Sequence, residues 1–275
     1  MRIRALLGVA CAFVLFVGVV AVAADSVLTD HDPIVIGNDY EFTAQNGVVS
    51  GSGTIGDPYI IAGWKIDAGY SRYGISIHRT DRYFVIRNVK ISGASQAGIF
   101  LSYVENGTVK DCDLSGNWIG IALNFASSNL VKDCTLSANT DGIHLYFSHD
   151  NDIFDNTVAK NDTAIWLDAS NSCHIIGNTL ENNHMGAYLD LGSQGNLIYN
   201  NVFSGNLHNA HSVDVNAWDK DGRGNYWSDW RAIDADNDGI WDSPYVIRSE
   251  GDQDNFPLAT PPQETKGKSK ASVGN

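Results

Sequence analysis

The sequence repeats itself every 22 residues between Ala97 and Asn206. Read without any insertion, five blocks begin at Ala97, Ile119, Asp141, Thr163 and Met185, and a sixth block that precedes them is two residues longer. A fixed period of this length predicts an array of stacked units rather than one globular core. Each column of the repeat then becomes a row of neighbouring side chains on one surface.

Each block contains three short apolar stretches. The first alternates, as in Ile121 and Leu123, which is typical of a strand with one buried face. The second and third apolar positions recur in every block: Val109, Val131, Ile153, Ile175 and Leu197, then Leu114, Leu136, Val158, Leu180 and Val202. Three short strands separated by Asn, Ser and Gly turns leave no room for a helix. We therefore predict an all-β fold, a right-handed single-stranded parallel β-helix (a solenoid) with one coil per repeat.

One column between the second and third strands is rich in asparagine: Val89, Cys112, Cys134, Asn156, Asn178 and Asn200. Stacked asparagine amides bond to one another in a ladder, whereas a buried amide without partners costs about 1–3 kcal/mol. Cys112 and Cys134 would lie on neighbouring strands about 4.8 Å apart. In-register strands fit disulfide geometry poorly, so we expect stacked thiols rather than a bridge.

The ends of the chain depart from the repeat. Residues 1–23 combine two arginines, an uncharged apolar run and a small-residue motif, which is typical of a secretory signal peptide, with a retained anchor as the alternative. No other stretch is long and apolar enough to span a bilayer. We expect an N-terminal cap and first irregular coils over 24–72, regular coils over 73–206, a C-terminal cap over 207–258 and a disordered tail over 259–275. The location is then secreted, periplasmic or cell-surface.

The formal net charge of −14 argues against nucleic acid and other polyanions as direct partners. It favours divalent cations, and the C-terminal cap holds a candidate calcium site. Asp234, Asp236, Asp238 and Asp242 stand at positions 1, 3, 5 and 9 of a calcium loop. Tyr245 replaces the glutamate of position 12, so the loop is not an EF-hand. A solvated acidic turn is the alternative.

Two columns on the outer side of the first strand predict a ligand-binding face. They read Ser76, Phe100, Ala122, His144, Trp166, Tyr188 and His78, Ser102, Asn124, Tyr146, Asp168, Asp190. Because the flanking Ile and Leu residues point inward, we expect these side chains to face solvent. Exposed aromatic rings beside carboxylates suit the apolar faces and hydroxyls of sugars. We therefore predict that His144, Tyr146, Trp166, Asp168, Tyr188 and Asp190 bind a polysaccharide or cell-envelope glycan. The alternative is that the rings only stack across strands.

The same face raises the possibility of catalysis. Asp168 and Asp190 would lie one strand apart, close to the roughly 5–5.5 Å separation of retaining glycosidase carboxylates, and His144 is a candidate acid or base. However, a repeat places carboxylates side by side by construction, and no lyase or hydrolase motif surrounds them. We expect a non-catalytic protein, with an extracellular polysaccharide lyase or hydrolase as the alternative.

Motifs at both ends carry a family resemblance: Gly51–Thr54 with Asp57–Trp64, the run Tyr83–Asn88, and Gly224–Asp229 with Asp234–Ile240 and Ser243–Ile247. Together they resemble NosD-like right-handed β-helix proteins. The resemblance implies either a periplasmic accessory function in copper-enzyme maturation or a carbohydrate-binding or sugar-hydrolysing β-helix. Beyond the signal peptide the chain has a single methionine, Met185, and no histidine pair except His208 and His211, which gives direct copper binding little support.

Overall fold

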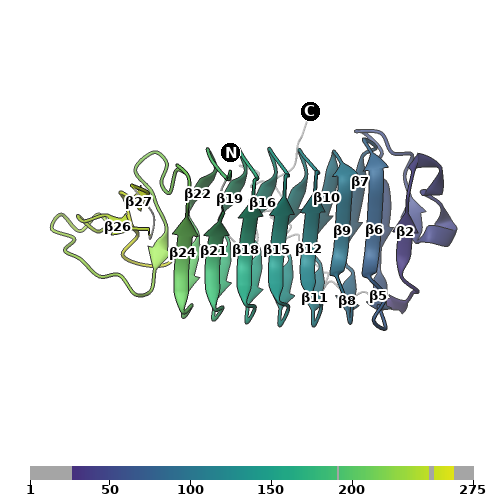
Figure 1. The fold of residues 1–275 in the computed structure, drawn as a ribbon, viewed down its shortest axis with the longest axis horizontal. Helices are drawn as coiled ribbons and strands as arrows, with labels where there is room; N and C mark the ends of the chain where they lie inside the picture. The colour runs from purple at the N-terminus through teal and green to yellow at the C-terminus, as the bar shows by residue number, and fades with distance from the viewer. Residues whose placement is uncertain (1–26, 191, 248–250, 263–275) are drawn as a thin grey trace, which may run out of the picture.

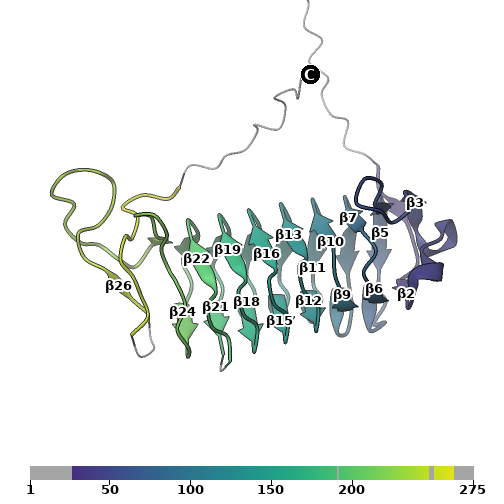
Figure 2. The same ribbon diagram turned by 90° about the horizontal axis from the view of Figure 1, so that it is seen from above.

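The computed structural model describes residues 27–190, 192–247 and 251–262. The expected signal peptide (1–23) lies outside this part, and so does the expected tail after residue 262. The described chain winds into a right-handed parallel β-helix, an elongated stack of coils in which strands of one kind lie side by side (Figures 1 and 2). The fold predicted from the repeat is therefore confirmed.

Three sheets form the sides of the solenoid, and their strands pair in parallel except where Val48–Ser50 pairs antiparallel with Tyr59–Ala62. The first-strand sheet has the order β2-β6-β9-β12-β15-β18-β21-β24. Its strands are β2 (Ile34–Ile36), β6 (Tyr73–Thr80), β9 (Ala97–Val104), β12 (Ile119–Asn124), β15 (Asp141–Tyr146), β18 (Thr163–Asp168), β21 (Met185–Leu189) and β24 (His208–Ser212). Figure 1 looks onto this sheet.

The second-strand sheet consists of β3 (Val48–Ser50), β4 (Tyr59–Ala62), β7 (Phe84–Arg87), β10 (Gly107–Lys110), β13 (Leu130–Lys132), β16 (Asp152–Phe154), β19 (His174–Ile176) and β22 (Leu197–Tyr199). The third-strand sheet consists of β1 (Thr29–Asp30), β5 (Trp64–Asp67), β8 (Lys90–Ser92), β11 (Asp113–Ser115), β14 (Thr135–Ser137), β17 (Thr157–Ala159), β20 (Thr179–Glu181), β23 (Val202–Ser204) and β25 (Tyr226–Trp227). Parallel pairing thus continues beyond both expected limits of the regular coils, 73 and 206.

The core is a set of apolar columns that run along the axis. Ile121 and Leu123 of β12 pair in register with Ile143 and Leu145 of β15, and all four are buried. The position before the first of these apolar residues, Gly120 in β12, has no room for a side chain larger than that of alanine. A Cβ on Gly120 would lie 2.6 Å from the carbonyl oxygen of Gly142 and 2.7 Å from Leu136. This close packing explains the Gly or Ala at the second position of every block.

The fifth coil contains one residue more than the repeat predicts. Thr163 pairs with Met185, 22 residues on, but Met185 pairs with His208, 23 residues on. The extra residue lies between Leu189 and Ser193, because Leu167 pairs with Leu189 whereas Ser170 donates its N–H to Ser193. The expectation of an uninterrupted period is therefore wrong at this turn. The inward apolar residues of this coil are Ile198 and Phe203 rather than Leu197 and Val202.

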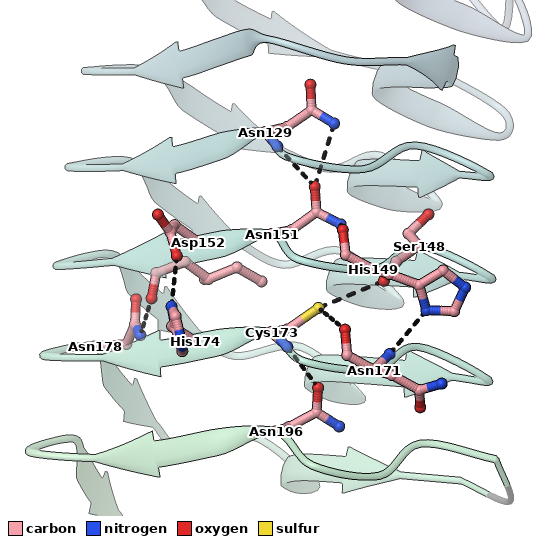
Figure 3. Close-up of polar contacts among 11 residues, drawn as sticks. Asn129, Ser148, His149, Asn151, Asp152, Asn171, Cys173, His174, Asn178 and Asn196 are labelled. Carbon is pink, nitrogen blue, oxygen red and sulfur yellow. Dashed lines mark hydrogen bonds and ion pairs between the residues drawn. The ribbon is translucent and has the colours of Figure 1, made fainter.

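Asparagine ladders occupy all three corners of the coil. The first ladder follows the first strand (Asn129, Asn151, Cys173, Asn196, Asn216), the second follows the second strand (Cys134, Asn156, Asn178, Asn201, Asn225), and the third follows the third strand (Asn117, Asn139, Asn161, Asn183, Asn206). Figure 3 shows part of the first ladder. In each, an Asn Oδ1 accepts the backbone N–H of the residue one coil earlier. The predicted ladder is confirmed, but Asn201 takes the place expected for Asn200.

The cysteines replace asparagine in these ladders. Cys112 and Cys134 are buried, free thiols whose Sγ atoms donate to the carbonyl oxygens of Lys110 and Lys132 at 3.0 and 3.2 Å. The prediction of stacked thiols is therefore confirmed. A hydrogen bond with Cys112, together with burial, raises the pKa of Cys134. Burial raises the pKa of Cys173, in the first ladder, to about 12, so the thiols of Cys134 and Cys173 are protonated and poor nucleophiles.

Both ends of the solenoid are closed by irregular structure. The N-terminal end carries two short 3₁₀ helices, η1 (Asp39–Glu41) and η2 (Ala44–Asn46). At the C-terminal end the ring of Trp227 lies between Phe203 and Tyr245, with centroids 4.3 and 4.1 Å away. A small antiparallel pair, β26 (Tyr245–Val246) and β27 (Gln253–Asp254), completes this cap.

Each ladder ends on an aspartate of the C-terminal half. Asp254 accepts from the backbone N–H of Asn225 at 2.7 Å, and Asp252 accepts from that of Asn216 at 3.3 Å. In the third ladder Asn206 donates to Asn209, whose amide donates to Asp229 at 2.7 Å. The last polar groups of the three ladders are thereby satisfied without another coil.

Candidate functional site

The two columns predicted for the outer face lie in register along the first-strand sheet. Phe100, Ala122, His144, Trp166 and Tyr188 pair strand by strand, and the column continues to His211 on β24. The second column also pairs as predicted from His78 to Asp168. The sheet therefore assembles the predicted residues on one face.

The first column is more buried than expected. His144 and Trp166 stack with centroids 4.4 Å apart and planes at 1°, and Trp166 meets Tyr188 edge-on at 5.9 Å. Ser76 is only 1% exposed and Ala122 only 6%. The expectation that every member of this column faces solvent is wrong, because in-register rings at strand spacing cover one another.

This stacking sets the charge state of His144. Burial lowers its pKa to about 4, and burial raises the pKa of Asp141, whose Oδ2 lies 4.0 Å from the His144 Nδ1, to about 6. His144 is therefore a neutral imidazole at pH 7. Within the described part of the chain, neither its Nε2 nor the Nε1 of Trp166 has a hydrogen-bond partner.

The candidate carboxylates lie at the end of the same columns. Asp168 closes β18 and is half-buried, as is Asp190 after β21. Burial raises the pKa of Asp168, and the negative charge of Asp190 raises it further. The two carboxylates therefore interact electrostatically, as expected for groups on adjacent coils. Among the aromatic side chains of the two columns, Tyr146 is the most exposed, at 37%.

A third aromatic column, absent from the sequence prediction, follows directly after the first strand. Tyr103, Phe125 and Phe147 are 55%, 41% and 41% exposed and stack with centroids 5.1 and 5.3 Å apart. All three adopt a positive φ of 46–54°, a conformation that bulky residues rarely adopt. Tyr146 meets Phe125 and Phe147 edge-on, so this turn column joins the predicted face. The 22-residue spacing of the three rings is the signal that could have revealed it.

An open hollow of about 460 Å³ adjoins this turn column. Tyr103 and Phe125 form its aromatic wall, and polar side chains complete the lining: Asp39, Arg79, Thr80, Asp81, Glu105 and Ser127. Asp39 belongs to η1, so the N-terminal cap supplies one wall and the coils supply the other. The hollow is of the size that binds small ligands.

The polar side of the hollow is held in place by hydrogen bonds. Thr80 donates to Asp39 Oδ1 at 2.7 Å, and Arg82 Nε donates to Oδ2 at 3.0 Å. The Thr80 hydrogen bond, followed by the Arg82 guanidinium, holds the pKa of Asp39 below its usual value. Asp39 is thus an ionised acceptor at neutral pH.

The predicted calcium loop brings three of its four aspartates together. Asp234, Asp236 and Asp238 each place a carboxylate oxygen within 4.8 Å of the others. The Asp234 carboxylate also accepts the backbone N–H groups of Asp238 and Gly239. Asp242 is not a member of this group; its Oδ2 accepts the N–H of Ala235 and braces the loop.

Residues 35–232 match the profile of a family described as periplasmic copper-binding protein NosD. The chain belongs to this family. The match spans most of the β-helix and confirms the resemblance drawn from the terminal motifs. No curated protein sequence matches the chain, and no helix within its described residues is long and apolar enough to cross a membrane.

Several solved structures are similar to this NosD-family chain. They include a mutant of the periplasmic alginate epimerase AlgG (20% identity, TM-score 0.53, 56% of this chain and 38% of that chain), the pectate lyase Pel9A (14%, 0.50, 72% and 64%) and an alginate lyase from Paenibacillus sp. (13%, 0.51, 80% and 92%). The chain thus spans about 38% of the epimerase. At these identities the similarity shows the shared β-helix fold alone.

Proposed function

We propose that this chain is a periplasmic or extracellular NosD-family protein that binds a glycan along the outer face of its first-strand sheet. The observation that carries the proposal is the hollow in which the exposed rings of Tyr103 and Phe125 stand beside carboxylates, an arginine and hydroxyls. Aromatic walls accept the apolar faces of sugar rings, and the polar groups hydrogen-bond to hydroxyls.

The rest of the face extends this site along the axis. Tyr146 contacts the turn column and belongs to the predicted second column, which leads on to Asp168 and Asp190. Trp166 and Tyr188 run beside it and are half-buried. His144 is mostly buried and positions the ring of Trp166 by stacking. An extended chain lying across several coils would therefore meet aromatic and carboxylate groups in succession.

The charge of the site favours an uncharged glycan. Asp39, Asp81 and Glu105 line the hollow against one arginine, Arg79, and the whole chain carries a formal net charge of −14. Both repel polyuronates such as the alginate and pectate named for the similar structures. The proposed ligand class is a neutral polysaccharide.

The proposal includes binding without turnover. His144 is neutral at pH 7 and mostly buried, so it holds no imidazolium proton to donate, and the repeat alone accounts for Asp168 and Asp190 lying side by side. A polysaccharide lyase or hydrolase working on the same face is the competing function, and the test below separates the two.

Electrophoresis through gels that contain neutral polysaccharides tests this function. We expect retarded migration of the unsubstituted protein, and an association constant about tenfold lower for Tyr103→Ala and for Phe125→Ala, since one sugar–ring contact contributes about 1 kcal/mol or more. Tyr70→Ala removes a ring that is 89% exposed and lies outside the hollow, and should leave migration unchanged.

Three results would count against the proposal. Equal retardation of Tyr103→Ala and the unsubstituted protein removes the hollow as the site. Retardation by alginate or pectate but by no neutral polymer overturns the ligand class. Release of reducing ends or unsaturated products that disappears in Asp168→Ala and Asp190→Ala establishes the enzyme alternative instead.

Calcium in the C-terminal cap forms the second part of the proposal. Three carboxylates that lie within 4.8 Å of one another repel unless a cation offsets their charge, and oxygen ligands suit Ca²⁺. We expect chelation by EDTA to lower the melting temperature by several degrees, and Ca²⁺ to restore it. Asp236→Asn should weaken this response. A melting temperature that does not respond to chelation would remove calcium from the proposal.

A further inference from the structure

The turn column is a stack of three rings, and such a stack has two end faces. Tyr103 and Phe147 stack on opposite sides of Phe125, with planes at 4° and 15° to it. The hollow lies at the Tyr103 end, because Arg79, which is level with Tyr103 on the preceding coil, lines it too. The other end of the stack is the outer face of Phe147, about two coil spacings, roughly 10 Å, further along the axis.

Tyr146 lies beside the stack and leaves this outer face uncovered. Its ring meets those of Phe125 and Phe147 at 88° and 76°, with centroids 5.7 and 4.7 Å away. A ring on the outer face would have Phe147 between itself and Phe125, and its centroid would lie well beyond 5.7 Å from that of Phe125. Among the described residues, Phe147 has ring contacts with Phe125 and Tyr146 and with no other ring.

The next coils continue the turn column with very small residues. Tyr146 pairs with Asp168, so Ala169 takes the position of Phe147 one coil later, with nearly the same φ, 48° against 46°. Gly192 follows in the column, since a Cβ built on it would lie 3.5 Å from the Cβ of Ala169. The turn column therefore places nothing larger than a methyl group beyond Phe147, whose side chain is 41% exposed.

Two hydrogen-bond donors of fixed orientation border this face. The Nδ1 of His149 accepts the backbone N–H of Asn171 at 3.1 Å, so the neutral imidazole carries its proton on Nε2. The Oδ1 of Asn171 accepts the backbone N–H of Gln194 at 2.9 Å, which leaves the NH₂ group of this amide for a ligand. His149 lies two residues after Phe147, and Asn171 lies two residues after Ala169. Figure 3 shows both side chains on the outer side of the first ladder.

Asp168 supplies hydrogen-bond acceptors on the opposite border. It ends β18 directly before Ala169 and is half-buried. A sugar hydroxyl both donates and accepts, so one sugar ring can donate to this carboxylate and accept from His149 or Asn171. The apolar face of the same sugar ring suits the exposed face of an aromatic ring. The groups around the outer face of Phe147 thus match the two kinds of surface that a single pyranose presents.

We propose that the outer face of Phe147, bordered by Asp168, His149 and Asn171, is a second sugar-binding subsite at the far end of the ring stack. The subsite rests on the proposed function, because its ligand is one pyranose residue of the same neutral glycan that the hollow binds. The two end faces are separated by the whole stack. A glycan chain that lies along the axis therefore reaches both, whereas a single sugar residue reaches only one.

Ala169→Phe tests the subsite by filling it. A fourth ring at this position continues the stack over the outer face of Phe147, and Phe125 and Phe147 already adopt the required φ in the same column. Affinity electrophoresis in gels that contain galactomannan, hydroxyethylcellulose or xyloglucan provides the measurement. We expect binding about tenfold weaker than that of the unsubstituted protein, with no loss in melting temperature.

Ala138→Phe is the matched control. Ala138 is also an exposed alanine of positive φ, 54°, but it lies after β14 at a different corner of the coil. This substitution should leave binding unchanged. NMR of the alanine methyl groups in the unsubstituted protein gives a measurement that depends on no variant. Titration with oligosaccharides cut from the retarding polymer should shift the Ala169 methyl signal and leave that of Ala138 in place.

The results distinguish this subsite from the hollow. Weaker binding by Tyr103→Ala with unchanged binding by Ala169→Phe overturns the subsite and leaves the proposed function standing. Weaker binding by Ala169→Phe with unchanged binding by Tyr103→Ala supports the subsite and removes the hollow. Equal effects of Ala169→Phe and Ala138→Phe, or an Ala169 methyl signal that stays fixed while the glycan binds, also overturn the subsite. If none of the three polymers retards the unsubstituted protein, both proposals are wrong.

Discussion

Asn201→Ala is expected to lower the free energy of unfolding by about 4 kcal/mol. The Oδ1 of Asn201 accepts both the backbone N–H and the side-chain amide of Asn178, at 2.9 and 3.0 Å. Its own amide donates to the carbonyl oxygen of Ile175 at 2.8 Å and to Asn225 at 2.9 Å. Alanine leaves these fully buried groups without their hydrogen-bond partner, and each such group costs about 1–3 kcal/mol. Urea denaturation followed by circular dichroism measures the change.

The neighbouring residue gives a matched control. The Oδ1 of Asn200 is buried with no partner among the described residues, and its φ is +60°, a conformation that glycine adopts without strain. Asn200→Gly should therefore leave stability unchanged or raise it slightly. A larger loss for Asn200→Gly than for Asn201→Ala would restore the uninterrupted 22-residue register and contradict the 23-residue coil.

Asp254→Ala is expected to destabilise the C-terminal cap by about 3–5 kcal/mol. The Asp254 carboxylate is fully buried and accepts from the N–H of Asn225 at 2.7 Å, from the indole of Trp227 at 2.8 Å and from the N–H of Phe256 at 3.0 Å. Alanine leaves all three donors unpaired. Amide hydrogen exchange should show protection lost first in β25 and β27, with β12 and β15 affected least.

Two control variants are expected to destabilise the protein less than Asp254→Ala does. Trp227→Phe keeps an aromatic ring between Phe203 and Tyr245 but removes one donor, so its cost should be smaller than that of Asp254→Ala. Asp32→Ala removes an exposed carboxylate at the opposite end and should have no measurable effect. Equal stability of Asp254→Ala and Asp32→Ala would show that the carboxylate does not close the second ladder.

Burial also makes Asp254 sensitive to pH. Desolvation by burial raises its pKa to about 6, against hydrogen bonds from Asn225, Trp227 and Phe256 that lower it. A carboxyl whose folded pKa is raised stabilises the fold fully below its unfolded pKa of 3.8, and this contribution is lost as the pH rises through about 6. The loss of unfolding free energy caused by Asp254→Ala should therefore be measured at one fixed pH above 7.

The sequence predicted the fold well because a β-helix converts columns into sheets. It failed at the fifth coil for an identifiable reason. The segment from Leu197 to Phe203 reads two aliphatic residues, a tyrosine, two asparagines and two more apolar residues, so both registers satisfy the pattern. Only the turn after Leu189, where one residue is added, decides between them.

The candidate site was predicted less completely. The pairing that aligns His144, Trp166 and Tyr188 followed from the period, but their mutual burial depends on ring stacking that no single column reveals. Tyr103 and Phe125 lie in a turn column, which strand alternation does not test.

The aspartates that end the ladders also bear on self-association. An open β-helix end is a template on which further strands can add, as in a growing fibre. An ionised carboxylate accepts hydrogen bonds and has no proton to pass on. Asp229, Asp252 and Asp254 therefore receive the last donors of the coils and leave no ladder donor for a strand of the next molecule. The same three side chains that complete the fold thus oppose end-to-end polymerisation.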